Sequence, residues 1–142
     1  MRRRARVRIR AWLVACAILL AGWGSASAQD PNTPTATVIR NLIESFIGDD
    51  TVRSVRLTGA TADVHVAMDD VKAMPRDRKE WIWFFTDVTD IATSRVFFPP
   101  AFHEGVSRVH RINIQYTLAG KTIVRATRSR SDRKSTVTVS PP

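Results

Sequence analysis

The chain has 142 residues, with 22 lysines and arginines against 13 aspartates and glutamates, so its formal net charge is +9 at pH 7. Six of the basic residues and none of the acidic ones precede Gln29, which leaves 16 basic and 13 acidic residues and a net charge of +3 for the rest. So modest a charge does not favour a nucleic-acid-binding protein. The single cysteine, Cys16, also precedes Gln29, so the remainder cannot form a disulfide, a thiolate metal site or a cysteine nucleophile.

The first 28 residues have the pattern of a secretory signal peptide. Six arginines between Met1 and Ala11 precede an apolar run that ends at Gly24, and Ala26-Ser27-Ala28 supplies a small-residue cleavage pattern. We therefore expect export and cleavage near Ala28, with the mature protein in the periplasm or outside the cell. We expect no transmembrane segment in the mature chain.

Three other interpretations of this leader stay open. The apolar run is roughly 14 residues long, whereas a membrane-spanning helix needs about 20, so a retained anchor is the weaker alternative. Leu13-Val14-Ala15-Cys16 matches a lipoprotein box by its letters, but Arg10 lies almost against it. The arginines near Met1 resemble a twin-arginine signal, although the apolar residues of that signal class do not follow them.

The mature chain begins with a linker at residues 29–34 and a helix. Thr33-Pro34 has the pattern of an N-cap followed by proline at the first helical position, and Gly48 is a suitable C-terminal cap. Apolar residues recur at helical spacing between them, namely Val38, Ile39, Leu42, Ile43, Phe46 and Ile47. Alternating apolar residues in 55–57 and 62–68, on either side of Thr58-Gly59-Ala60-Thr61, then predict a hairpin.

A second helix is predicted over residues 76–95, with Asp69-Asp70 and Pro75 as start signals. Its apolar stripe is widened by Ile82 and Trp83, which indicates burial between layers or contact with a partner. The prolines in residues 97–105 predict a loop. Alternation then predicts strands over 106–118 and 121–128.

These elements predict one α+β domain over residues 35–128. Their order is helix, strand, strand, helix, strand, strand, which predicts a two-layer sandwich: a largely antiparallel four-stranded sheet with both helices on one face. Residues 129–142 have the composition of a flexible basic tail, with a short edge strand at Val137 and Val139 as the alternative. The order is similar to that of small bacterial envelope modules such as the phospholipid-associated BON domain, in the first helix and hairpin, Val38 to Val66. The aromatic helix and the proline loop differ from that pattern, and no function is carried over from it.

The histidines are the candidates for catalysis or metal binding, and none of them completes a motif. His103-Glu104 lacks the second histidine of a zinc-peptidase helix. Asp63 and His65 share one strand face and could form half of a site only if another strand supplied the rest. We interpret His110 as structural. The sequence therefore predicts no catalytic residue, no metal ligand and no cofactor.

Charge and aromatic residues point instead to binding. Residues 105–142 contain eight basic residues and one acidic residue, a composition that suits an anionic surface. The phenylalanines of the aromatic loop beside it would either cap the open end of the core or, if exposed, mark an interaction site. The candidate interaction surface comprises Phe97, Phe98, Phe102, Arg125, Arg128, Arg130, Arg133 and Lys134.

The sequence thus predicts a small exported bacterial domain that binds an envelope protein or an anionic surface without catalysis. One alternative is a small-ligand carrier with a pocket between the sheet and the aromatic helix. Another is a hydrolase or metal-dependent enzyme that uses His65, His103 or His110. Partner identity, biological process and oligomeric state do not follow from the sequence.

Overall fold

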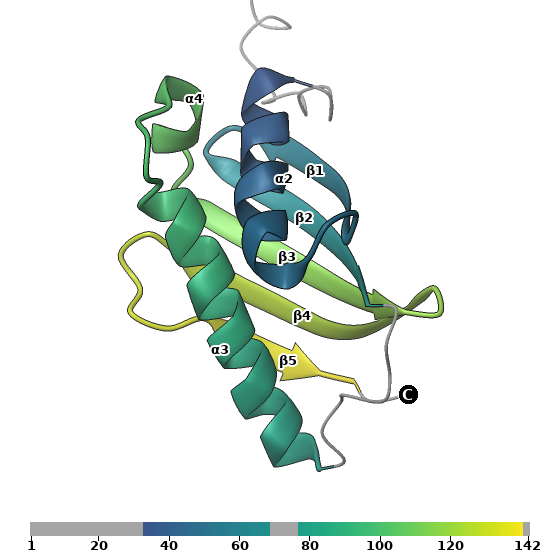
Figure 1. Cartoon of the computed structure of the whole chain (residues 1–142). Helices are drawn as coiled ribbons and strands as arrows, with labels where there is room; N and C mark the ends of the chain where they lie inside the picture. The colour runs from purple at the N-terminus through teal and green to yellow at the C-terminus, as the bar shows by residue number, and fades with distance from the viewer. Residues whose placement is uncertain (1–32, 69–76, 141–142) are drawn as a thin grey trace, which may run out of the picture.

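The computed structural model describes residues 33–68 and 77–140. Its helices are α2 (Pro34–Ile47), α3 (Arg78–Phe97) and α4 (Glu104–Ser107). Its strands are β1 (Val52–Thr58), β2 (Thr61–Met68), β3 (Arg111–Leu118), β4 (Lys121–Ser129) and β5 (Thr136–Val139). The helices lie over one face of a single sheet (Figure 1). None of these described helices combines the length and the apolar character needed to cross a membrane.

The sheet has five strands in the order β1-β2-β3-β4-β5. Neighbouring strands are antiparallel except β2 and β3, which run parallel with Val64 opposite Ile114. Tight hairpins join β1 to β2 and β3 to β4, whereas the long connection through α3 brings the chain back to start β3 in the direction of β2. The α+β class is confirmed, but the prediction of a largely antiparallel four-stranded sheet with two helices is wrong in these details.

The fifth strand comes from the segment predicted as a flexible tail. Thr136–Val139 pairs with β4, placing Val137 opposite Ala126 and Val139 opposite Val124. Val139 is 5% exposed and Val137 packs against the core. Burial of two alternating valines on the helix-covered face therefore outweighs the polar composition of the segment.

A side chain just before each of the two long helices caps its first turn. Thr33 Oγ1 accepts a hydrogen bond from the Ala36 N–H at 3.3 Å, and Gly48 follows the last turn of α2 with φ of 131°. The Asp77 side chain accepts a hydrogen bond from the Lys79 N–H at the start of α3. This helix was predicted at 76–95 and spans 78–97. The predicted start signals Asp69-Asp70 and Pro75 lie outside the described residues.

The core between α3 and the sheet is filled by aromatic rings. Phe85 is fully buried, and its ring centroid lies 5.7 Å from Trp81, 5.2 Å from Phe84 and 4.8 Å from Tyr116. These rings occupy the space in which a carrier would hold its ligand, so the structure does not favour the carrier alternative. Trp83, by contrast, is 72% exposed on the outer side of α3.

Tyr116 is the only tyrosine of the chain, so its ionisation can be followed directly by ultraviolet absorbance. Burial raises the pKa of Tyr116 well above its ordinary value of 10.0; the hydrogen bond with Thr89 opposes this shift and the Asp90 carboxylate adds to it. The folded protein keeps the proton that the unfolded chain loses, so stability is present below pH 10 and falls as the pH rises above it. We expect no tyrosinate absorbance from the folded chain until it unfolds. Tyr116→Phe should flatten the alkaline loss of stability, whereas a normal tyrosine titration in the folded state would contradict this expectation.

Candidate functional site

The histidines occupy separate places in the structure. His65 Nε2 lies 2.8 Å from Thr117 Oγ1 on the uncovered sheet face, whereas Asp63 on the same strand accepts a hydrogen bond from Asn113 Nδ2. His103 precedes α4 and His110 precedes β3, both with exposed side chains. Within residues 33–68 and 77–140, no group of three or more His, Cys, Asp or Glu side chains could hold a metal ion.

The three phenylalanines of the proline loop differ in exposure. Phe97 is 2% exposed and ends α3 inside the core, whereas Phe98 is 68% exposed and Phe102 is 81% exposed. Two large apolar side chains so exposed within one short loop commonly mark a surface that meets a partner. The loop therefore presents two of the three predicted aromatic residues to solvent.

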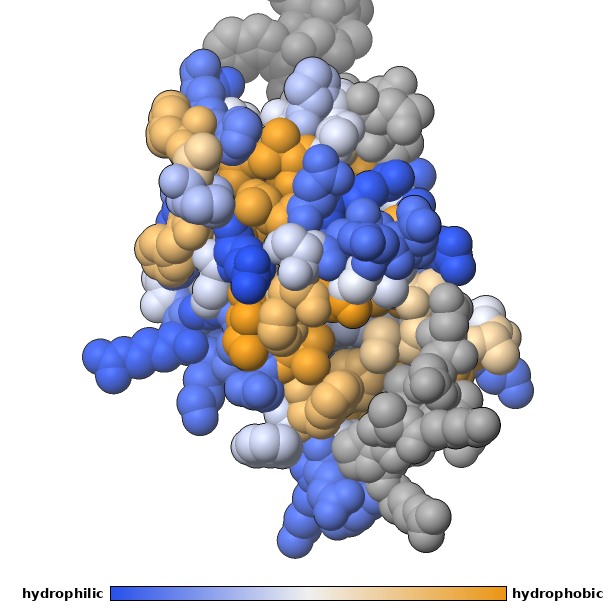
Figure 2. Space-filling view, in the orientation of Figure 1, coloured by the Kyte–Doolittle hydropathy of each residue, from blue (hydrophilic) through white to orange (hydrophobic). Residues whose placement is uncertain are grey.

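Phe98 stands between two surface hollows. One is an apolar groove of 660 Å³ between α2 and the loop, lined by Val38, Leu42, Arg95, Phe98 and Pro100 among others. Figure 2 shows the apolar floor between α2 and the segment that joins α3 to α4. The second hollow, of 510 Å³, lies on the other side and is also lined by Arg95 and Phe98.

Basic side chains flank Phe98. Arg95 lies beside α2, where its Nη1 donates to Ser45 Oγ at 3.2 Å and its guanidinium stands 5.8 Å from the centre of the Phe46 ring. Arg133 lines the second hollow together with Phe98 and Ile91. We call Ile91, Arg95, Phe98, Phe102 and Arg133 the aromatic loop surface.

Arg128 was predicted on the interaction surface, but it is 7% exposed and binds within the fold. Its Nη1 donates to the Asp90 carbonyl at 2.7 Å and to the hydroxyls of Thr93 and Ser94 at 3.0 Å and 2.7 Å. Its Nε and Nη2 donate to the carbonyls of Asp132 and Arg133. One guanidinium thus joins α3 to the turn between β4 and β5.

Arg130 is also occupied within the fold. It donates to the carbonyls of Phe97 and Val109 at 2.8 Å and 2.9 Å, with longer contacts to those of Val106 and Ser107. Its guanidinium lies 5.2 Å from the centre of the Phe97 ring. A cation that binds the last carbonyls of α3 and α4 compensates for missing backbone partners there. Arg130 therefore fixes both ends of the loop that carries Phe98 and Phe102.

The remaining predicted residues lie on different surfaces. Arg125 is exposed on the uncovered face of the sheet, opposite the helices. Arg133 and Lys134 are exposed in the turn before β5. The structure thus brings Phe98 and Arg133 together, separates Arg125 from them, and uses Phe97, Arg128 and Arg130 for packing.

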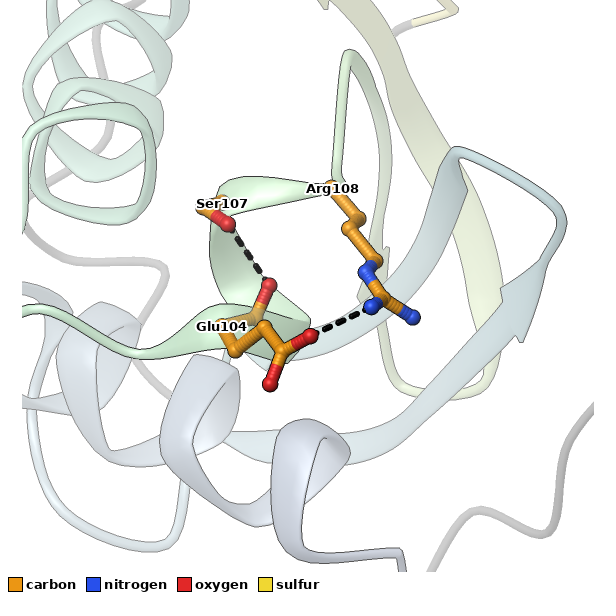
Figure 3. A network of polar contacts seen from close by, with 3 residues as sticks. All are labelled: Glu104, Ser107 and Arg108. Carbon is orange, nitrogen blue, oxygen red and sulfur yellow. Dashed lines mark hydrogen bonds and ion pairs between the residues drawn. The ribbon is translucent and has the colours of Figure 1, made fainter.

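The short helix α4 closes one end of the loop. Ser107 Oγ donates to the Glu104 carbonyl at 2.6 Å, and Arg108 forms an ion pair with the Glu104 carboxylate (Figure 3). Gly105 approaches α2 so closely that an added Cβ would lie 2.1 Å from Thr35 Oγ1. Glycine at this position is what allows α4 to pack against the first turn of α2.

The uncovered sheet face carries two rows of polar side chains that run across all five strands. The pairing places these residues opposite one another in register. One row comprises Arg56, Asp63, Asn113, Thr127 and Thr136, and the other comprises Ser54, His65, Gln115, Arg125 and Thr138. We call these two rows the polar sheet face.

Sequence reasoning missed two of these features. Alternation along each strand marks the polar positions, but only the strand order and register show that they form continuous rows. Arg95 was interpreted as part of a helix end, although it lies beside the exposed Phe98 in space. Its spacing of three residues from Phe98 was the available signal.

Comparisons with known proteins give no family. No family model matches the chain, and no curated protein matches it. It is similar to the solved structure of a sex pheromone staph-cAM373 precursor, with 11% sequence identity and a TM-score of 0.44. The similarity covers 80% of this chain and 40% of that one, and so distant a likeness assigns no function.

Proposed function

We propose that this chain is an exported, non-enzymatic binding domain that attaches to an anionic membrane surface through the aromatic loop surface. The observation that carries the proposal is the exposure of Phe98 and Phe102, at 68% and 81%, in one short loop, with the exposed side chains of Arg95 and Arg133 beside Phe98. Aromatic side chains that enter the interface and cations that contact lipid phosphates are the two components of peripheral membrane attachment.

The charges near the loop support this choice of partner. The Asp90 carboxylate accepts a hydrogen bond from the Ser135 N–H at 2.6 Å, and Glu104 is paired with Arg108. These two carboxylates are therefore engaged within the fold, whereas Arg133 extends into solvent. An anionic surface fits this arrangement better than a neutral one.

The expected contributions are large enough to measure. Full burial of one phenylalanine side chain contributes about 1.5–3 kcal/mol, and one basic residue near an anionic membrane contributes about 1 kcal/mol. Because 1.4 kcal/mol corresponds to about tenfold in affinity, loss of Phe98 and Phe102 should weaken attachment at least about tenfold. Loss of the two arginines should weaken it by a similar factor at low salt and by less at high salt.

The test places an environment-sensitive nitrobenzoxadiazole label at the loop of the full chain. Cys16→Ser removes the native thiol, and Ala101→Cys introduces one between the two exposed phenylalanines. With phosphatidylglycerol vesicles we expect a blue-shifted, brighter emission that phosphatidylcholine vesicles do not produce. Phe98→Ser with Phe102→Ser should abolish the shift.

A matched label at Thr138→Cys, exposed on the opposite face, separates loop insertion from attachment through the leader. The label at position 138 should stay in water while the label at 101 enters lipid. Equal shifts at both positions, or no shift at 101, would overturn the proposal. Retention by envelope proteins in the absence of lipid would instead favour a protein partner and count against a membrane.

A further inference from the structure

The polar sheet face lies opposite the aromatic loop surface and is shaped as a shallow hollow. The hollow has a volume of 590 Å³ and is lined by side chains of β1, β2, β3 and β4. The described helices all lie on the other side of the sheet (Figure 1). This face therefore presents a polar concavity that the membrane proposal does not use.

Hydrogen bonds hold the central side chains of this hollow in fixed orientations. Asn113 donates to Asp63 at 2.8 Å and accepts from Thr127 Oγ1 at 3.0 Å. Gln115 Nε2 donates to Thr122 Oγ1 at 2.6 Å. Each amide retains a second N–H, and the Gln115 carbonyl oxygen has acceptor capacity for a further group. The hollow thus offers oriented donors and acceptors of the kind that bind hydroxyl groups.

The charge of this face favours an anionic ligand. Arg56 and Arg125 are exposed and line the hollow from two different strands, where Asp63 is the one carboxylate among the lining residues. That carboxylate already accepts the hydrogen bond from Asn113. Guanidinium groups recognise carboxylates through paired, charge-assisted hydrogen bonds.

The spacing of the arginines favours an extended ligand. Arg56 lies on β1 and Arg125 on β4, three strand spacings apart, which is about 14 Å. A small anion would contact both only if the two long side chains bent toward each other over the hollow. A chain of linked sugars that crosses the strands can contact both and place its hydroxyl groups over Asn113 and Gln115.

The composition of the face distinguishes a glycan from a single-stranded nucleic acid. Tyr116 is buried toward the helices, and the five described strands carry no aromatic side chain on the polar sheet face. Proteins that bind single strands on an open sheet depend on aromatic rings that stack on the bases. Sugar hydroxyls and carboxylates need only the hydrogen-bonding and charged groups present here.

We propose that the polar sheet face binds an acidic, carboxylate-bearing glycan, with Arg56 and Arg125 on the carboxylates and with Asn113 and Gln115 on the hydroxyls. This inference does not rest on the membrane proposal, because the two surfaces share no residue. Either can fail while the other stands.

The experiment measures fluorescence anisotropy of labelled polygalacturonate oligomers titrated with the full chain. We expect saturable binding that weakens about tenfold in the double variant Arg56→Gln with Arg125→Gln, because charge-assisted hydrogen bonds are lost. Asn113→Ala should weaken binding without changing the net charge. Arg133→Gln, which removes one positive charge from the turn before β5, should change the affinity less than about twofold.

Circular dichroism of each variant checks that the sheet is intact. We expect it to be intact, because all of the substituted side chains but Asn113 are exposed. Equal weakening by Arg133→Gln would show non-specific charge attraction and overturn the proposal. Equally tight binding of neutral dextran or of an oligothymidylate would also overturn it, as would the absence of saturable binding. Labels at positions 101 and 138 with vesicles test the membrane proposal separately.

Discussion

Arg128→Met is expected to lower the free energy of unfolding by about 3 kcal/mol. This is the larger of the two losses of stability that we expect from replacing an arginine whose guanidinium binds within the fold. The native side chain makes hydrogen bonds to α3 and to the turn before β5 through all three of its nitrogens. Methionine has a similar length but leaves the carbonyls of Asp132 and Arg133 without this donor. These backbone carbonyls remain in place after the substitution. Stability can be gained when both partners of a buried polar pair are replaced by apolar groups, but here only one partner is replaced.

Urea unfolding followed by circular dichroism measures this effect. Arg128→Lys should recover only part of the loss, because one ammonium group cannot reach the acceptors at two opposite edges of the planar guanidinium. The matched control is Arg125→Met on the same strand, whose exposed side chain faces the other way and should change stability by less than about 0.5 kcal/mol. A loss of under about 1 kcal/mol for Arg128→Met would show that the network stabilises little.

Arg130→Met is expected to lower the free energy of unfolding by about 2 kcal/mol and to loosen the aromatic loop locally. Arg130 binds the carbonyls at the end of α3 and after α4, so its loss frees both ends of the connecting loop. Hydrogen exchange should accelerate at Ser107 and Val109, whose N–H groups bond to the carbonyls of His103 and Val106. The hydrogen-exchange rates of the β1–β2 hairpin should change only as far as the global free energy of unfolding changes.

Arg133→Met serves as the control, since this neighbouring arginine is exposed and caps no helix. If hydrogen exchange accelerates by the same factor in the loop amides and in the β1–β2 amides of Arg130→Met, Arg130 does not stabilise the loop locally. If the loop alone accelerates, the same variant should also weaken the lipid-dependent shift of the label at position 101. That result would connect the packing of one arginine to the surface proposed to bind membranes.

The secondary structure was predictable because its signals are local. Thr33-Pro34 and Gly48 mark the ends of α2, and the observed helix begins and ends beside them. The alternating apolar residues of β1, β2 and β3 were correctly assigned to the core, since a strand presents successive side chains to opposite faces. The strand predicted over 106–118 begins only at Arg111, because Val106 and Ser107 belong to α4. The exposure of Phe98 and Phe102 did not follow from the sequence, because the same residues could equally have capped the open end of the core.

The functions of the basic residues were not predictable in the same way. Arg125, Arg128 and Arg130 read as one basic run, yet the first lies on the polar sheet face and the other two bind backbone carbonyls on the helix side. A guanidinium is buried only where several acceptors meet around it, and here those acceptors come from α3, α4 and the turn after β4. Their convergence depends on contacts between residues more than 30 positions apart.

By itself the sequence determined the ends of α2, the two hairpins and the α+β class, because capping, turn chemistry and apolar periodicity act over a few residues. It placed α3 two residues early and did not predict α4. Only the tertiary structure decided the parallel pairing of β2 with β3, the recruitment of β5, and the separation of the basic residues between two opposite surfaces. Strand order and register depend on how the layers bury their apolar faces together, so the two polar rows and the aromatic loop surface exist only in the folded chain.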